Sequence, residues 1–145
     1  MSLTVPNVFN VNGKVALVTG GGRGLGKSIA EGFLAAGAAK AYIASRDAEA
    51  LEATAKELSP EGNCIAIPAN LATVEGVKAL ADEIKAREDK LHILVNNSGA
   101  AWGGPLTGFP EKGWDKVFDL NVKTPFYLTG DCLLYTSPSP RDRNV

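Results

Sequence analysis

The sequence predicts an α/β fold, a doubly wound parallel sheet, on two observations. Short apolar runs alternate with segments of about 12 residues in which apolar side chains recur at helical spacing. A cluster of glycines directly follows the first apolar run, where this fold places the turn between its first strand and first helix. Right-handed crossovers then give the strand order 3-2-1-4, incomplete because the chain ends before a fifth strand.

The first half of the chain contains two strands and two helices. We expect strands at residues 14–19 and 41–44, separated by the glycine loop 20–26 and a helix that ends at Gly37. Asp47 is expected to cap the second helix. The apolar faces of the two helices are predicted to contain Leu25, Ile29, Phe33, Ala36, Leu51, Ala55 and Leu58.

The second half continues the alternation. Strands are expected at residues 64–67 and 91–95, and Thr73 is expected to start the helix between them. That helix has one apolar face, formed by Val74, Val77, Leu80, Ala81 and Ile84. A loop at 99–110 precedes a last helical segment, in which we interpret Trp114, Val117 and Phe118 as core residues and Asn121 as a polar residue at a kink beside Pro125.

Composition excludes several classes of protein. The chain has 145 residues, a net charge of −1, 45% hydrophobic and 21% charged residues, which is typical of one globular domain without a charged surface for nucleic acid or membranes. No segment predicts a transmembrane helix or a secretory signal. Cys64 and Cys132 are far apart, which argues against a disulfide scaffold or a metal site and favours the cytoplasm. His92, the single histidine, opens a strand and is expected to be a surface or hydrogen-bonded residue rather than a catalyst.

The glycine loop is a candidate phosphate site. Glycines allow a sharp turn and let backbone amides approach an anion, and the following helix N-terminus offers unpaired N–H groups. The strand before the loop and the helix after it supply the context that this interpretation needs. The alternative is a tight turn without a ligand. If the glycine loop does bind a phosphate group, the domain is expected to be Rossmann-like and its ligand to be a dinucleotide.

The residues after the second strand indicate which dinucleotide binds. Ser45 is small and neutral, and the guanidinium of Arg46 can hold the 2′-phosphate of NADP. Arg23, in the glycine loop, could reach the same phosphate. NADP is therefore favoured over NAD, although NAD would be favoured if Asp47 turned inward instead of capping a helix.

Three segments resemble the short-chain dehydrogenase/reductase family. Residues 19–26 (TGGGRGLG) match its TGxxxGxG motif, residues 96–99 (NNSG) match its NNAG motif with Ser98 in place of alanine, and residues 119–122 (DLNV) match the segment of its active-site asparagine. Within the family, the sequence is most similar to NADP-dependent 3-oxoacyl reductases of the rhamnolipid-pathway type.

The resemblance implies roles for individual residues. The cofactor-binding set would be Gly20, Arg23, Gly24, Leu25, Gly26, Ser45, Arg46, Asn70, Leu71, Asn97, Ser98 and Gly99. Asn121 would take part in catalysis by holding a water in a proton relay through its backbone carbonyl. The resemblance further implies hydride transfer between NADP(H) and a small carbonyl or alcohol substrate, in a homo-oligomer. The charge balance and the cysteine spacing already argue against nucleic acid, membranes and metal as partners.

The family's catalytic tyrosine and lysine, four residues apart, are missing from this sequence. Tyr42, Tyr127 and Tyr135 are followed at that spacing by Arg46, Asp131 and Ser139. Helical periodicity ends near Gly130, and residues 132–142 resemble a translated transposase sequencing adapter, because one choice of codons spells that adapter. We therefore expect a truncated dinucleotide-binding domain at 1–130, a non-native, disordered tail at 131–145, and a chain that folds poorly and reduces nothing.

Three functions remain open from the sequence. The first is an enzyme, an NADP-dependent carbonyl reductase or alcohol dehydrogenase, of which this chain is a catalytically incomplete part. The second is a dinucleotide-binding fragment without chemistry, or a truncated product without function. The third is a methyltransferase, which would need an acidic residue near the end of the second strand and would leave residues 96–99 unexplained.

Overall fold

A computed structural model describes residues 8–60 and 63–136, apart from the side chains of residues 134 and 135. The elements are β1 (Val15–Thr19), α2 (Gly24–Ala35), β2 (Lys40–Ser45), α3 (Ala48–Leu58), β3 (Cys64–Pro68), α4 (Val74–Arg87), β4 (Ile93–Val95), α5 (Glu111–Phe118), the π-helical turn η1 (Asp119–Lys123) and α6 (Thr124–Thr136).

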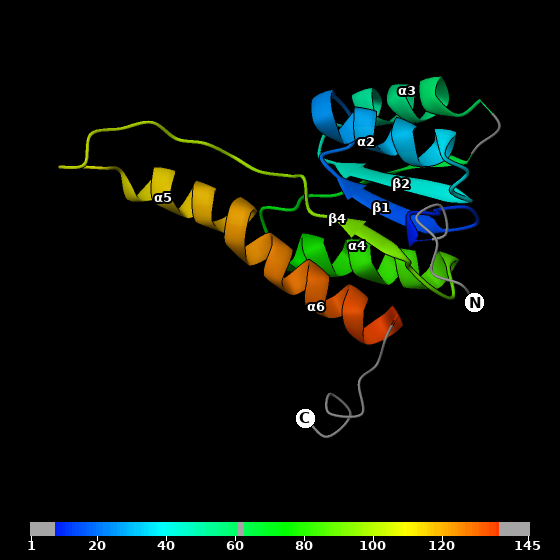
Figure 1. Cartoon of the computed structure of the whole chain (residues 1–145). Helices are drawn as coiled ribbons and strands as arrows, with labels where there is room; N and C mark the ends of the chain where they lie inside the picture. Colours follow the sequence, from blue (N-terminus) through cyan, green and yellow to red (C-terminus); the bar gives the residue numbers. More distant parts are fainter. Residues whose placement is uncertain (1–7, 61–62, 137–145) are drawn as a thin grey trace.

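The four strands form one parallel sheet in the order β3-β2-β1-β4, which confirms the predicted topology. Leu17 in β1 lies opposite Tyr42 in β2 and Leu94 in β4. Helices α2 and α3 cover one face of the sheet, and α4 and α6 cover the other (Figure 1). The described residues therefore form the three layers of a doubly wound fold.

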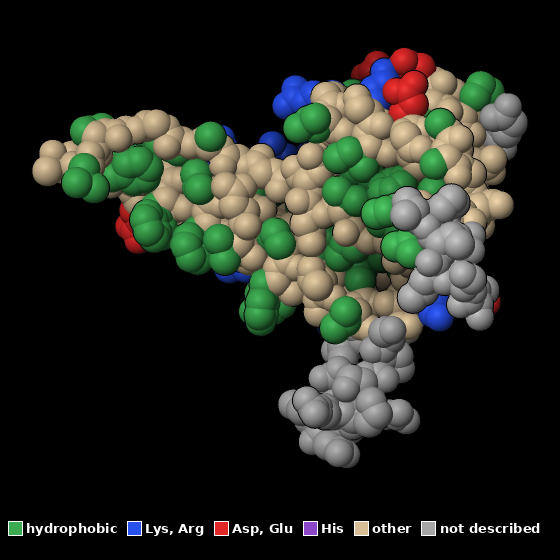
Figure 2. Space-filling view, in the orientation of Figure 1, with side chains coloured by type: hydrophobic (Ala, Val, Ile, Leu, Met, Phe, Trp, Pro, Cys, Tyr) green, Lys and Arg blue, Asp and Glu red, His purple; other side chains and the backbone are tan. Residues whose placement is uncertain are grey.

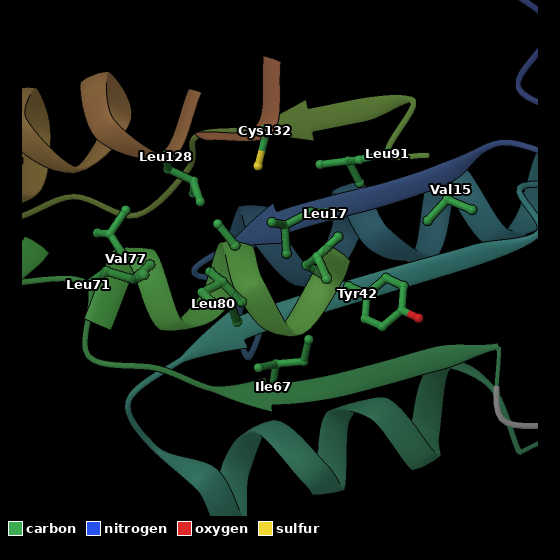
Figure 3. Packing of buried hydrophobic residues seen from close by; sticks show 13 residues of the cluster. Val15, Leu17, Tyr42, Ile67, Leu71, Val77, Leu80, Leu91, Leu128 and Cys132 are labelled. Carbon is green, nitrogen blue, oxygen red and sulfur yellow. The ribbon is translucent and has the colours of Figure 1, made fainter. Parts of the chain in front are cut away.

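The apolar runs of β1 and β2 are continuous because both faces of these strands are buried. Leu17 and Tyr42 point toward α4 and α6, where they join Leu80 and Leu128 (Figure 3). Their neighbours Val18 and Ile43 belong to the second core, under α2 and α3. Successive residues of each strand thus supply the two opposite cores.

Some residues that the sequence assigned to apolar faces are exposed. Leu25 and Val74 are 76% and 36% exposed, because they lie in the first turns of α2 and α4, ahead of the turns that pack on the sheet. The core interpretation is also wrong for Trp114 and Phe118, which are 61% and 47% exposed. Helix α5 extends away from the sheet (Figure 1). The rings of Trp114 and Phe118 stack on each other.

The last helix extends further than expected. Helix α6 continues to Thr136 rather than ending near Gly130, so residues 131–136 are helical and not disordered. Cys132 follows Leu128 by one helical turn, and both side chains are buried in the core against α4. The rest of the predicted tail, 137–145, lies outside the described residues.

Candidate functional site

A cleft of about 710 Å³ opens at the carboxyl ends of the strands, where ligands bind in doubly wound folds. It is bounded by the glycine loop after β1, the end of β2, the segment after β3, the segment after β4 and Leu120 of η1. The structure brings every predicted cofactor residue to this cleft except Gly26 and Asn70.

Two glycines shape the floor of the cleft at the start of α2. Gly24 has a φ of +55°, a left-handed conformation that glycine adopts without strain. Gly26 lies beneath the cleft, and a Cβ atom there would stand 2.2 Å from the carbonyl oxygen of Gly20 and 2.6 Å from Nδ2 of Asn97. Glycine at this position therefore lets the helix begin directly against the end of β1.

The N-terminus of α2 has no side-chain cap. Arg23 occupies the cap position without a capping hydrogen bond, and the first turn holds no acidic residue. By contrast, Asp47 caps α3 by accepting from the N–H of Ala50 at 3.1 Å, and Thr73 caps α4 by accepting from the N–H of Gly76 at 3.1 Å. The first-turn amides of α2 are therefore available to an anionic ligand in the cleft.

The mouth of the cleft is cationic. Arg23 and Arg46 are exposed, and within residues 8–60 and 63–136 neither guanidinium forms an ion pair. The carboxylate of Asp47 also lies at the mouth, but it accepts the capping hydrogen bond of α3, as the sequence predicted. Two free guanidinium groups beside the neutral Ser45 favour a ligand with phosphate groups.

One structural residue of the site was missed by sequence reasoning. Thr19 is 1% exposed, and its Oγ1 accepts from the backbone N–H groups of Asn97 and Ser98, each at 3.0 Å, while it donates to the carbonyl of Val95. Asn97 donates in return from Nδ2 to the Thr19 carbonyl at 3.0 Å. A hydroxyl at the end of an apolar strand signals such a role, because a buried hydroxyl needs partners.

Asn70 and Asn121 contact the backbone rather than the cleft. Oδ1 of Asn70, an exposed residue, accepts from the N–H of Ala72 at 3.2 Å. Asn121 accepts from the N–H of Ala100 at 2.9 Å and donates to its carbonyl at 2.8 Å, which ties η1 to the segment after β4. Pro125 has no N–H to give to the carbonyl of Asn121, four residues earlier, and the predicted kink is realised as the π-helical turn.

A hydrogen bond to Asp119 raises the pKa of the exposed Lys123 in η1. The other ionisable groups with shifted pKa values lie near the amino ends of the strands or in the core. Burial and the hydrogen bond to Glu88 raise the pKa of Tyr42. Burial opposes the ionisation of Glu88, but hydrogen bonds from Lys40 and Tyr42 outweigh it, so the pKa of this carboxyl is lowered. Burial, followed by Lys14 and Lys90, lowers the pKa of His92.

Metal sites and membrane-spanning helices are not found in the described part of the chain. In the ranges 8–60 and 63–136, no group of three His, Cys, Asp or Glu side chains could hold a metal ion. No helix in that part of the chain is long and apolar enough to cross a bilayer.

A glycine turn leading to an uncapped helix at the carboxyl edge of parallel strands defines a dinucleotide-binding type of domain. A sequence profile described as short chain dehydrogenase matches residues 14–138. The chain belongs to this family of oxidoreductases, as the three motifs indicated.

Individual relatives agree with this assignment. The chain is 48% identical over 118 residues to the rhamnolipids biosynthesis 3-oxoacyl-[acyl-carrier-protein] reductase of Pseudomonas aeruginosa, covering 81% of this chain and 46% of that protein. It is 34% identical over 123 residues to a 2-dehydro-3-deoxy-D-gluconate 5-dehydrogenase of Dickeya dadantii, covering 85% of this chain and 48% of that protein. The predicted similarity to the rhamnolipid-pathway type is confirmed.

Solved structures show the same likeness. The RhlG/NADP active-site complex of Pseudomonas aeruginosa matches with a TM-score of 0.81 and 46% identity, covering 88% of this chain and 49% of that one. L-sorbose reductase of Gluconobacter frateurii, complexed with NADPH and L-sorbose, matches with a TM-score of 0.81 and 28% identity, covering 86% and 48%. The chain thus spans about half the length of these relatives.

Proposed function

We propose that this chain binds NADP(H) in the cleft, and that the whole protein is an NADP-dependent oxidoreductase acting on a small carbonyl or alcohol substrate. The observation that carries the proposal is an uncapped α2 N-terminus in one cleft with the guanidinium groups of Arg23 and Arg46, which form no ion pair among the residues that the structure describes. The NADP and NADPH complexes among the similar structures support it.

The lining of the cleft fits the two anionic parts of this cofactor. The first-turn amides of α2 and the glycine loop would hold the pyrophosphate, which needs N–H donors and close backbone approach. Ser45 and the guanidinium of Arg46 would hold the 2′-phosphate. A carboxylate facing the ribose would favour NAD instead, but Asp47 accepts the capping bond of α3.

The other side of the cleft would hold the end of the cofactor that reacts. Asn97, Ser98 and Gly99 line this side, with Asn97 fixed by its bonds to β1. NADP(H), when bound, would supply or accept the hydride. Asn121 would contribute its backbone carbonyl to a proton relay, and its side chain holds η1 against Ala100.

The 145-residue chain is not expected to turn over a substrate by itself. None of its tyrosines is followed four residues later by lysine. Tyr42 is 1% exposed and donates to Glu88 near the amino ends of the strands, away from the cleft, so it cannot serve as the proton donor there. The second candidate function is therefore a dinucleotide-binding fragment without chemistry.

Fluorescence titration with NADPH and NADH tests the proposed binding. We expect tighter binding of NADPH, and we expect Arg46→Ala to weaken NADPH binding about tenfold, equivalent to ~1.4 kcal/mol for a lost charged contact, with little effect on NADH. Arg87→Ala is the matched control, because Arg87 pairs with Glu83 in the last turns of α4 and does not line the cleft. Equal loss in both variants, or no binding by the unchanged chain, would contradict the proposal.

We also propose that the whole protein is a cytoplasmic homo-oligomer. Exposed apolar side chains follow one another four residues apart along α5, η1 and α6: Trp114, Phe118, Val122 and Phe126. Patches of hydrophobic side chains lie along the projecting part of the molecule that contains α5 (Figure 2). A continuous apolar face of this kind favours burial against other protein surface. Light scattering on the full-length protein tests the assembly, and a monomer would contradict it.

A further inference from the structure

Thr124 joins the end of η1 to the segment after β3. The residue is 3% exposed and opens α6. Its Oγ1 lies within hydrogen-bonding distance of two carbonyl oxygens, that of Leu71, 53 residues earlier in the chain, and that of Asp119 at 2.9 Å. The hydroxyl therefore lies between the segment after β3, which contains Leu71, and the turn η1, which contains Asp119.

The hydroxyl of Thr124 has one proton, and it donates this proton in a hydrogen bond to the carbonyl of Leu71. The carbonyl of Asp119 already accepts the backbone N–H of Thr124, the i to i+5 bond of the π-helical turn. Leu71 is 3% exposed, and within the described ranges its carbonyl has no other hydrogen-bond donor. Without the hydroxyl, a buried carbonyl would be left unsatisfied, which is costly.

This bond connects two walls of the cleft. Leu71 lines the cleft on the β3 side, and Leu120, within η1, lines it as well. The neighbouring Asn121 ties the same turn to Ala100, after β4. The turn η1 is thus attached by side chains to the segments after both outer strands of the described sheet.

We propose that Thr124 is a positioning residue for the dinucleotide: its hydroxyl fixes the Leu71 wall against η1 and so sets the cleft in its binding-competent form. The inference rests on the proposed function, since it assumes that the cleft holds a dinucleotide. Without this bond, part of the population would adopt a form in which the Leu71 wall has moved. The apparent affinity for the dinucleotide then falls in proportion to the fraction of molecules that remain in the binding-competent form.

Three substitutions at this position separate the hydroxyl from the methyl group. Thr124→Val and Thr124→Ala remove the hydroxyl, and Thr124→Ser keeps it. We expect the Val and Ala variants to bind NADPH about tenfold more weakly, because the competent fraction falls by that factor. The Ser variant should bind like the unchanged chain. A residue that only fills space would give the opposite ranking, with Val close to the unchanged chain and Ser close to Ala, and that ranking would overturn the inference.

Thr129→Val is the matched control, because Thr129 lies on the same helix and its hydroxyl accepts a hydrogen bond from Asn96 at the exposed surface. Its affinity should be unchanged. Hydrogen exchange of residues 69–73 and 119–123 without ligand separates this inference from the proposed function. Faster exchange in Thr124→Val than in Thr124→Ser supports the contact even if the unchanged chain binds no NADPH. Equal exchange in these two variants would overturn it.

Discussion

The close approach of α2 to the end of β1 makes Gly26, beneath the candidate site, a position that is sensitive to substitution. An alanine Cβ at this position would stand 2.2 Å from the Gly20 carbonyl oxygen and 2.6 Å from Nδ2 of Asn97. The first of these neighbours is backbone, so it cannot turn aside as a flexible side chain would. Gly32, on the same helix, has no atom within 4 Å of the equivalent Cβ position.

The same substitution should therefore have opposite effects at the two positions. Gly32→Ala should stabilise the chain by about 1 kcal/mol, the difference in helix propensity between alanine and glycine. Gly26→Ala gains the same propensity but adds an overpacking cost of about 3 kcal/mol, for a net loss of about 2 kcal/mol. The two variants should differ by about 3 kcal/mol in the free energy of unfolding.

Urea unfolding followed by far-ultraviolet circular dichroism measures this difference. With a slope of about 2 kcal/mol per molar urea, the midpoints of the two variants should lie about 1.5 M apart. If Gly26→Ala does not fold at all while Gly32→Ala does, the direction of the effect is still established. Equal midpoints for the two variants would refute the packing of α2 against β1 described above.

Three further predictions concern single residues outside that contact. Asp47→Ala should cost about 1 kcal/mol in urea unfolding, because α3 loses its cap; no loss would contradict the capping role. His92 accepts from the N–H of Val15 as a neutral ring, and its pKa is lowered, so the folded chain is stabilised above the ordinary value of 6.5 and loses this stability as the pH falls below it. Between pH 7.5 and pH 5.5 the free energy of unfolding should therefore drop more in the unchanged chain than in His92→Gln, and equal drops would disprove this. Burial raises the pKa of the Cys64 and Cys132 thiols to about 11, so both should react slowly with a disulfide reagent at pH 8 and quickly in urea, whereas equal rates would show that they are not buried.

Local signals explain why the cleft side of the fold could be predicted from the sequence. The β1 strand, the glycine turn and the start of α2 are adjacent in the chain, and each has its own composition. The caps Asp47 and Thr73 act within three residues of themselves, on the N–H groups of Ala50 and Gly76. Strand order then followed from the handedness of the crossovers.

The features that were missed depend on contacts between distant segments. The bond between Thr124 and Leu71 joins residues 53 positions apart, and the bonds between Asn121 and Ala100 span 21. Helical spacing showed that Trp114 shares a face with Phe118, but it could not show whether any surface covers that face. Leu25 was misplaced because the glycine loop leaves the first turn of α2 over the cleft.

The distribution of satisfied polar groups gives a physical reason why the ligand site lies at one edge of the sheet. Near the amino ends of the strands, Lys40 and Tyr42 donate to Glu88, and His92 bonds the backbone of β1. These groups satisfy one another without a ligand. At the carboxyl ends, Thr19 and Asn97 likewise bond neighbouring backbone, but the α2 amides lack a side-chain cap. In the part of the chain that the structure describes, the guanidinium groups of the glycine loop and of the β2 end have no carboxylate partner. Donors without acceptors, gathered in one cleft, favour an anionic ligand at the carboxyl edge, whereas the polar groups at the amino edge already have hydrogen-bond partners.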